Sequence, residues 1–249
     1  MAAIALLHAC PLSPAMFDEQ ARALRAAGHE VVVPDLLTAT AIGDAQPDLG
    51  VLAHHVRAVM SDAGHSTFAV AGLSMGGYVA MALLRLAAHR VSGLALLDTK
   101  ATADSEVAAK GRLEYAERVA REGMDWVPTA TIEALLGETT RATKPEVVAQ
   151  VDRWILAAES AAVVWAQQAM AARPDSTADL AVFRRPAVVV VGQEDTLSPL
   201  PEALAMAAAL GGVPVAEIPT SGHLSAVESP SAVSRALVAW ADRISPGAP

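Results

Sequence analysis

The chain has 249 residues, of which 53% are hydrophobic, and its formal net charge at pH 7 is −9. This length suits one large domain, or a domain with an insertion, and the composition is sufficient to fill a core. The acidic balance without any run of Lys and Arg argues against a nucleic-acid partner, and the single cysteine excludes an internal disulfide and leaves no zinc-ligand pattern.

The first ten residues, "MAAIALLHAC", are similar to a short secretory signal in hydrophobicity but not in charge. A signal needs a positively charged stretch before its apolar segment, and the first basic residue of this chain is Arg22. The apolar run is also far shorter than the roughly 18 residues needed to span a bilayer. We therefore predict a buried strand over 4–9, and we expect a cytoplasmic protein with no membrane partner.

Short apolar runs recur along the chain, and each ends in residues that are typical of turns. Most are apolar throughout rather than alternating, as in parallel strands that are buried on both faces. Helical patterns at Phe17–Ala27, Leu49–Ala63 and Tyr78–His89 separate them, and Gly28 is suited to end the first helix. This alternation predicts a doubly wound α/β fold with a mostly parallel sheet of about six strands. The predicted strands are 4–9, 30–36, 67–74, 91–99, 186–195 and 213–223.

The strand–helix alternation stops between about residues 100 and 182. Ala, Glu, Arg and Trp recur there at helical spacing, without a convincing strand. We therefore predict a core of residues 1–99 and 183–249, with residues 100–182 inserted as a helical cap. Trp126, Trp154 and Trp165 fall within this cap. Packing between cap helices is the simpler interpretation of these tryptophans, and lining of a substrate pocket is the alternative that we carry forward.

The stretch "VAGLSMGGYVAMALL" joins a predicted strand to a predicted helix and contains a G-x-S-x-G pattern at Gly72, Ser74 and Gly76. A serine on such a sharp turn has a strained backbone that raises its hydroxyl above the sheet, and small residues two before and two after leave room for the turn. The amides at the start of the helix would stabilise negative charge developing beside the serine. The simpler alternative is a glycine-rich turn with a helix-capping serine. The flanking strand and helix favour Ser74 as a nucleophile.

A serine nucleophile needs a base, and the base needs a carboxylate to orient it. His223 follows the last predicted strand, in a loop before the terminal helix, where parallel sheets present groups to ligands. His8 ends the first strand and has a structural interpretation. The remaining histidines are predicted to be surface residues in or beside helices: His29, His54, His55, His65 and His89.

The orienting carboxylate has three candidates. Asp195, in "VVVVGQEDTLSP", follows the penultimate strand, and the chain order Ser, Asp, His is the order of this architecture. Asp98 follows the strand "LALL" and is a credible rival, whereas Glu194 is a weaker one. We predict Asp195 as the acid of the triad.

These motifs together resemble the α/β-hydrolase family over essentially the whole chain, and in particular its small cap-bearing serine esterases and lactonases. The resemblance lies in "HACPLSPAMF", "VVVPDL", "GLSMGG", "GQEDTLSP" and "SGHLSAVESP", which occur in the family's order. It implies an oxyanion hole formed by the backbone amides of Cys10 and Met75, with the thiol of Cys10 incidental. Ala9 stands where the family has glycine. The chain begins at the strand that is usually third, so we expect the common leading hairpin to be absent.

The leading functional hypothesis is a serine hydrolase of carboxylic esters, lactones or thioesters that works through an acyl-enzyme. It needs a small-molecule substrate and no cofactor or metal, and the sequence leaves the oligomeric state open. A second hypothesis keeps the triad but cleaves a carbon–carbon bond next to a ketone. A third is a non-catalytic binding or receptor protein on the same fold, since a fold alone does not determine function.

Overall fold

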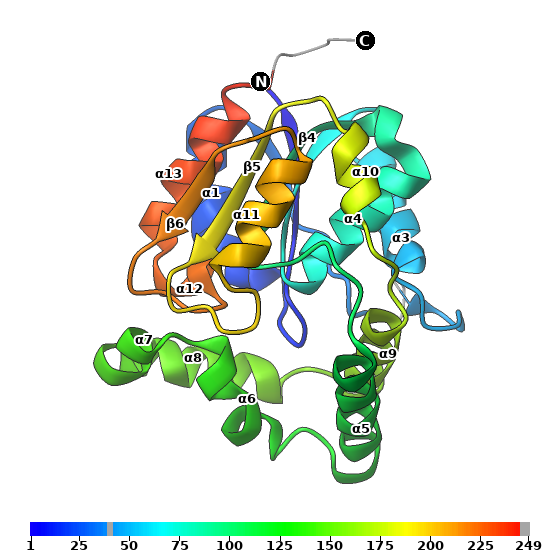
Figure 1. The fold of residues 1–249 in the computed structure, drawn as a ribbon, viewed down its shortest axis with the longest axis vertical. Coiled ribbons are helices and arrows are strands. Elements are labelled where there is room, and N and C mark those ends of the chain that lie inside the picture. Colours follow the sequence, from blue (N-terminus) through cyan, green and yellow to red (C-terminus); the bar gives the residue numbers. More distant parts are fainter. Residues whose placement is uncertain (39–41, 245–249) are drawn as a thin grey trace.

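The computed structural model describes residues 1–38 and 42–244, and its centre is a single six-stranded sheet (Figure 1). All neighbouring strands are parallel, in the order β2-β1-β3-β4-β5-β6. The predicted doubly wound α/β sheet is therefore confirmed. The strands are β1 (Ala3–Leu7), β2 (Glu30–Val32), β3 (Phe68–Leu73), β4 (Val91–Leu97), β5 (Ala187–Gly192) and β6 (Val215–Ile218).

Both faces of the sheet are buried, which explains why the strands are apolar throughout. Successive side chains of a strand point to opposite faces. In β1, Ala5 and Leu7 belong to one core cluster, while Ile4 and Leu6 belong to the other. The first cluster is covered by α3 (Leu49–Asp62), α4 (Met75–Ala87) and α11 (Leu200–Ala209), and the second by α1 (Asp18–Ala26) and α13 (Pro230–Ala241).

Local sequence signals account for the ends of the core helices. Gly28 has φ +88°, a conformation that glycine adopts at little cost, and it ends the turn that follows α1. The side chain of Asp48 accepts a hydrogen bond from the amide of Gly50 and caps the start of α3. The predicted helix Tyr78–His89 begins earlier than expected, at Met75, because the turn at Ser74 leads directly into it.

A group of helices lies beyond the carboxyl ends of the strands, in the position expected for a cap (Figure 1). α10 (Thr177–Val182) follows this group in sequence but packs against α4 and α11 of the core. The division of the chain into a core and a cap of residues 100–182 stays a prediction. The helices beyond the sheet are α5 (Glu106–Glu122), α6 (Val127–Leu135), α7 (Glu138–Thr143), α8 (Pro145–Leu156) and α9 (Ser160–Ala171).

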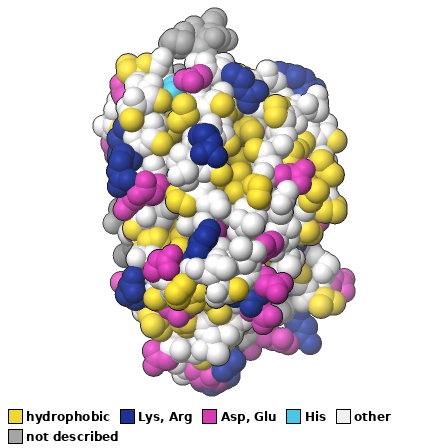
Figure 2. Space-filling view, turned by 90° about the vertical axis from the view of Figure 1, so that its left-hand side faces the viewer, with side chains coloured by type: hydrophobic (Ala, Val, Ile, Leu, Met, Phe, Trp, Pro, Cys, Tyr) yellow, Lys and Arg dark blue, Asp and Glu magenta, His cyan; other side chains and the backbone are white. Residues whose placement is uncertain are grey.

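Three short helices complete the described elements: α12 (Ser225–Glu228) and the 3-10 helices Pro14–Phe17 and Ala88–Arg90. Within the described part of the chain, no helix combines the length and apolar character that a membrane span requires. On the face drawn in Figure 2, basic and acidic side chains are interspersed with hydrophobic and neutral ones. This face therefore presents no continuous basic stripe among the described residues.

Candidate active site

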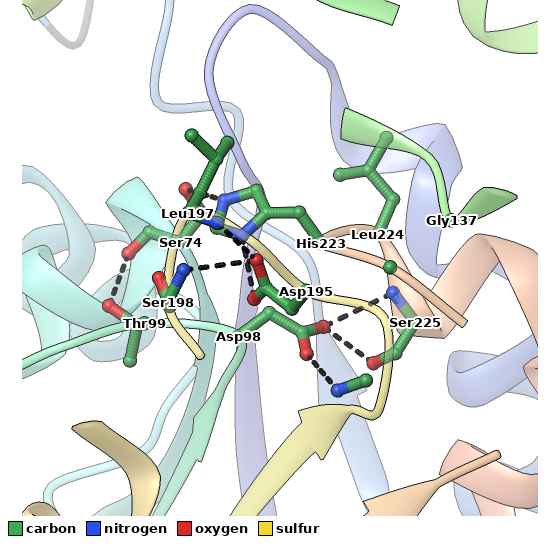
Figure 3. Close-up of polar contacts among 12 residues, drawn as sticks. Ser74, Asp98, Thr99, Gly137, Asp195, Leu197, Ser198, His223, Leu224 and Ser225 are labelled. Carbon is green, nitrogen blue, oxygen red and sulfur yellow. Dashed lines mark hydrogen bonds and ion pairs between the residues drawn. The ribbon is translucent and has the colours of Figure 1, made fainter. Parts of the chain in front are cut away.

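Ser74 lies on the sharp turn between β3 and α4, as the G-x-S-x-G pattern predicts (Figure 3). Its backbone has φ 55° and ψ −115°, a combination that residues other than glycine rarely adopt. Two hydrogen bonds hold this conformation. The amide of Ser74 donates to the carbonyl of Leu97 at 3.0 Å, and the Thr99 hydroxyl donates to the Ser74 carbonyl at 2.9 Å.

The two glycines of the pattern are required by close backbone packing around this turn. A Cβ atom added to Gly76 would overlap the carbonyl group of Leu7 in β1, and one added to Gly72 would overlap the carbonyl of Gly76. Backbone atoms cannot move aside as flexible side chains can. The spacing of glycine two residues before and two after Ser74 therefore follows from the packing of β3 and α4 against β1.

Ser74, His223 and Asp195 lie in one hydrogen-bonded chain across the carboxyl end of the sheet (Figure 3). The distance from His223 Nε2 to Ser74 Oγ is 2.8 Å, and His223 Nδ1 lies 2.9 Å from Asp195 Oδ2. The histidine and aspartate side chains are almost completely buried. Residues separated by as many as 149 positions are thus placed at the spacing that proton transfer from a serine hydroxyl requires.

The turn after β5 divides the two oxygens of Asp195 between the backbone and the histidine. Oδ1 accepts the amides of Leu197 and Ser198 at 2.8 and 3.0 Å, which leaves Oδ2 for His223. Burial acts to raise the pKa of Asp195, but the hydrogen bond and charge of His223 and the two amides outweigh it, so the pKa lies below its usual value. Asp195 is therefore a carboxylate near neutral pH.

The two rival carboxylates face other partners. Asp98 Oδ1 accepts the amide of Gly192 at 2.8 Å, and its Oδ2 accepts both the amide and the hydroxyl of Ser225 (Figure 3). Burial, and then the charge of Asp195, raise the pKa of Asp98 well above its usual value. Glu194, in the turn after β5, accepts hydrogen bonds from the amide and hydroxyl of Thr139 in α7.

The loop that carries His223 is fixed by Glu228, a buried residue that the sequence analysis did not identify. Glu228 Oε1 accepts the amides of Gly222 and Leu224, the two neighbours of His223, at 2.9 and 3.2 Å. Its Oε2 accepts the amide of Gly137, between α6 and α7, at 2.8 Å. One carboxylate thus joins the histidine loop to the cap. A glutamate five residues after the histidine carries no local pattern that would have revealed this role.

The loop after β1, which carries Cys10, is held by hydrogen bonds of His8. His8 Nε2 accepts the amide of Leu36 at 2.9 Å, so its Nδ1 carries the proton and donates to the carbonyl of Ala9 at 2.9 Å. Among the described residues, the non-glycine residues with positive φ are Ser74, Asp98 and Thr220, so Ala9 fits this loop without backbone strain.

Met75 opens α4 directly beside Ser74, and Cys10 lines the same cavity as Ser74. The oxyanion-hole role of these two backbone amides stays a prediction.

His29, expected at the surface, is instead buried, and its Nδ1 accepts the amide of Ala2 at 3.3 Å.

A cavity of about 380 Å³ opens onto Ser74 and His223, between the sheet and the cap. α5, α6 and α9 supply much of its wall. Its lining also includes charged side chains that the sequence analysis did not single out. The lining residues are Cys10, Pro11, Ser74, Tyr78, Lys100, Asp104, Ala108, Gly111, Arg112, Tyr115, Ala130, Thr131, Ala134, Leu135, Gln167, Met170, Leu197, Ser198 and His223.

The three cap tryptophans are not among the described lining residues of this cavity, which favours the simpler interpretation, packing, over the alternative of a pocket lining. Trp126 packs edge-on against Tyr115, with ring centroids 5.1 Å apart. Trp154 borders a separate hollow beside Leu12, and Trp165 Nε1 donates to the carbonyl of Ala45 at 2.8 Å. Helical spacing places tryptophans on a buried face but does not say whether a cavity or another side chain meets them.

Within residues 1–38 and 42–244, no group of three or more His, Cys, Asp or Glu side chains is arranged to hold a metal ion. The arrangement around the cavity is a hydroxyl, an imidazole and a carboxylate in series. Such a series can deprotonate the hydroxyl and return the proton to a leaving group.

The sheet and the turn at Ser74 define an α/β-hydrolase architecture, and comparison with known proteins agrees. The sequence model of the alpha/beta hydrolase fold family matches residues 2–230, so the chain belongs to this family. Among curated protein sequences, no significant match was found.

Several solved structures are similar to the chain over nearly its whole length. A thermophilic esterase from Thermogutta terrifontis, solved with malate bound, is 34% identical with a TM-score of 0.92, covering 98% of this chain and 90% of that one. An enol-lactonase from Burkholderia xenovorans LB400 is 22% identical with a TM-score of 0.85, covering 97% and 91%. A putative non-heme bromoperoxidase from Mycobacterium tuberculosis H37Rv is 19% identical with a TM-score of 0.84, covering 99% and 94%. The last two likenesses show the fold alone.

Proposed function

We propose that the protein is a serine hydrolase that cleaves carboxylic esters or lactones through an acyl-enzyme intermediate. The observation that carries this proposal is the hydrogen-bonded series from Ser74 through His223 to Asp195, with the serine hydroxyl at the mouth of a cavity. Membership of the α/β-hydrolase family and the 34% identity to a solved esterase support a hydrolase.

The first half of the reaction forms the acyl-enzyme. His223 Nε2 takes the proton of Ser74 as Oγ attacks the carbonyl carbon, and Asp195 stabilises the imidazolium that results. The negative charge that develops on the carbonyl oxygen would be held by the amides of Cys10 and Met75. As the carbon–oxygen bond breaks, His223 returns the proton to the leaving alcohol. In a lactone the leaving alcohol stays attached to the acyl group.

The second half repeats these steps with water as the nucleophile. His223 deprotonates the water, which attacks the acyl-enzyme, and the proton then passes to Ser74 as the carboxylic acid leaves. The same three side chains therefore serve both halves of the reaction.

Labelling with a fluorophosphonate tests the nucleophile directly. We expect covalent modification of Ser74 in the native protein, identified by peptide mass spectrometry, because the adjacent His223 activates this hydroxyl. Ser74→Ala should abolish labelling. Ser198→Ala is the matched control, since Ser198 lines the same cavity but lies outside the series, and it should retain labelling. Equal modification of the Ser74→Ala protein would overturn the assignment.

A substrate panel tests the reaction class. We expect turnover of an aryl ester and of a simple lactone, with no cleavage of a 1,5-diketone. Cleavage of the diketone at a rate equal to or above that of the esters would indicate a carbon–carbon hydrolase. Absence of turnover on every substrate, in a protein that binds small esters, would indicate a receptor.

A further inference from the structure

A group of charged side chains lies in the wall of the cavity, away from the serine, histidine and aspartate series. Lys100 follows β4, Asp104 lies in the segment before α5, and Arg112 comes from α5; all three line the cavity. Arg173, after α9, is almost completely buried and contacts Asp104. Three cations therefore surround one carboxylate, in a chain whose net charge is −9.

Each oxygen of the Asp104 carboxylate accepts a hydrogen bond from a different guanidinium group. Its Oδ1 accepts Arg173 Nη2 at 2.7 Å, and its Oδ2 accepts Arg112 Nε at 2.6 Å. Burial opposes ionisation of Asp104, but the two guanidinium groups outweigh it and hold its pKa at about 2. Lys100 Nζ forms an ion pair with Oδ1 at 3.7 Å, which is beyond hydrogen-bond distance.

Lys100 and Arg112 each keep donors that form no hydrogen bond to a carboxylate. Among the described residues, Lys100 Nζ has no acceptor at hydrogen-bond distance, and Arg112 Nη1 donates to the neutral side chains of Gln167 and Met170 at 3.1 and 3.6 Å. The Lys100 and Arg112 side chains are 22% and 25% exposed, within a cavity lining. The carboxylate of Asp195 faces His223.

We propose that Lys100 and Arg112 form a subsite for a carboxylate of the substrate, so that the enzyme prefers esters or lactones carrying a second, ionised carboxyl group. This inference rests on the hydrolase function proposed above and names its substrate class. Unsatisfied cationic donors in a partly enclosed cavity form stronger hydrogen bonds to an anion than to a neutral group. They also select against a methyl group at the same position, because burial of the donors without an acceptor is unfavourable.

Three substrates of similar size test the subsite. Ethyl butyrate is the neutral reference; monoethyl succinate replaces its acyl-chain methyl with a carboxylate, and carboxymethyl butyrate replaces its alcohol-side methyl in the same way. Each kcat/KM is divided by the rate constant for hydroxide-catalysed hydrolysis, which removes differences in intrinsic reactivity. We expect one anionic ester to exceed ethyl butyrate by at least about tenfold, and that advantage to shrink as sodium chloride is added. The ester that gains identifies the side of the scissile bond that faces the cations.

Lys100→Met is the principal variant, because it removes the charge while both guanidinium partners of Asp104 remain. We expect the ratio of kcat/KM for the preferred anionic ester over ethyl butyrate to fall by about tenfold, the effect of losing one charge-assisted hydrogen bond. Lys110→Met is the matched control. Lys110 lies on α5 but is exposed and pairs with Glu114 at 3.6 Å, so the ratio should stay within about twofold of the wild-type value.

Two results would overturn the subsite: ethyl butyrate hydrolysed as well as both anionic esters, or an unchanged ratio in a folded Lys100→Met protein. If none of the three esters is hydrolysed, the subsite is tested by binding alone, and the hydrolase function is decided by the aryl ester and lactone of the substrate panel. Monoethyl succinate and carboxymethyl butyrate are then titrated calorimetrically into the wild-type and Lys100→Met proteins. Binding of an anionic ester that the variant weakens by about tenfold would uphold the subsite without the hydrolase. Absence of binding would overturn the subsite.

Discussion

The turns after β4 and β5 present similar carboxylates at the same edge of the sheet, yet they face different partners. Asp98 and Asp195 are both buried, and both accept backbone amides. Asp98 has both oxygens occupied by Gly192 and Ser225, whereas Asp195 keeps one oxygen for His223. Burial at a strand end therefore does not identify the carboxylate that faces the histidine. The informative feature is an oxygen that the local backbone leaves available to the histidine.

The same difference appears in the acidity of the two groups. Burial and the nearby charge of Asp195 raise the pKa of Asp98, while His223 and two amides overcome burial to lower that of Asp195. Asp195 thus keeps the negative charge that an imidazolium requires. Asp98 connects the end of β5 to the helix that follows the histidine loop, which is a structural task.

The largest expected effect separates these two aspartates by activity. Asp195→Asn should lower kcat by about 10⁴-fold, because it removes the charge that stabilises the imidazolium and favours the wrong histidine tautomer. Asp98→Asn should lower kcat far less. Steady-state kinetics on one aryl ester, with both variants checked by circular dichroism, measures the difference. The assignment of the two aspartates would be reversed if Asp98→Asn lowered kcat strongly and Asp195→Asn left it unchanged.

A smaller effect on stability separates the serines beside the two aspartates. Ser225 donates its hydroxyl to Asp98, whereas Ser198 reaches Asp195 only through its backbone amide. Ser225→Ala should therefore lower the free energy of unfolding by roughly 1–3 kcal/mol, the cost of leaving a buried polar group without its hydrogen-bond partner. Ser198→Ala keeps its amide and should cost less. Urea unfolding of both variants tests this, and equal losses would contradict the structural role of Asp98.

The pH dependence of stability provides a third test. A carboxyl whose pKa is raised on folding binds protons more tightly in the folded state, so its contribution to stability increases as pH falls from the folded pKa toward the unfolded value near 3.8. Wild type should gain stability relative to Asp98→Asn as pH is lowered from 7, by up to about 1.4 kcal/mol per pH unit within that window. Denaturant unfolding at several pH values measures the difference. If the free energy of unfolding of the wild type fell relative to that of Asp98→Asn toward low pH, the raised pKa would be contradicted.

The sequence was sufficient to predict the elements whose signals are local. Apolar runs predicted the six strands and their parallel pairing, although the predicted strand 186–195 extends past the end of β5 at Gly192 and includes the polar turn 193–195. The G-x-S-x-G pattern predicted the turn at Ser74 because the backbone packs so closely around Gly72 and Gly76 that neither position has room for a side chain.

Features that depend on contacts between distant segments were not accessible in this way. The amides that Glu228 accepts include one 91 residues away, and Arg173 reaches Asp104 across 69 residues. Whether a cap tryptophan meets a cavity or another ring is likewise decided by the packing of whole helices. Such placements have no period or spacing in the sequence that could predict them.

The smallest expected effect concerns the turn after β1, where Cys10, unlike the two aspartates, is proposed to contribute only its backbone amide. Burial raises the pKa of the Cys10 thiol to about 12, with a smaller opposing influence from Arg112, so almost no thiolate is present near neutral pH. Cys10→Ala keeps the amide that is proposed to hold the oxyanion, and kcat/KM should stay within about threefold of wild type, or roughly 0.7 kcal/mol. Iodoacetamide should correspondingly react slowly with the native protein, because the thiolate is the attacking species. A collapse of turnover in a folded Cys10→Ala protein would instead make the thiol a participant in the reaction, and the turn after β1 would then resemble the turn after β5 in contributing a side chain.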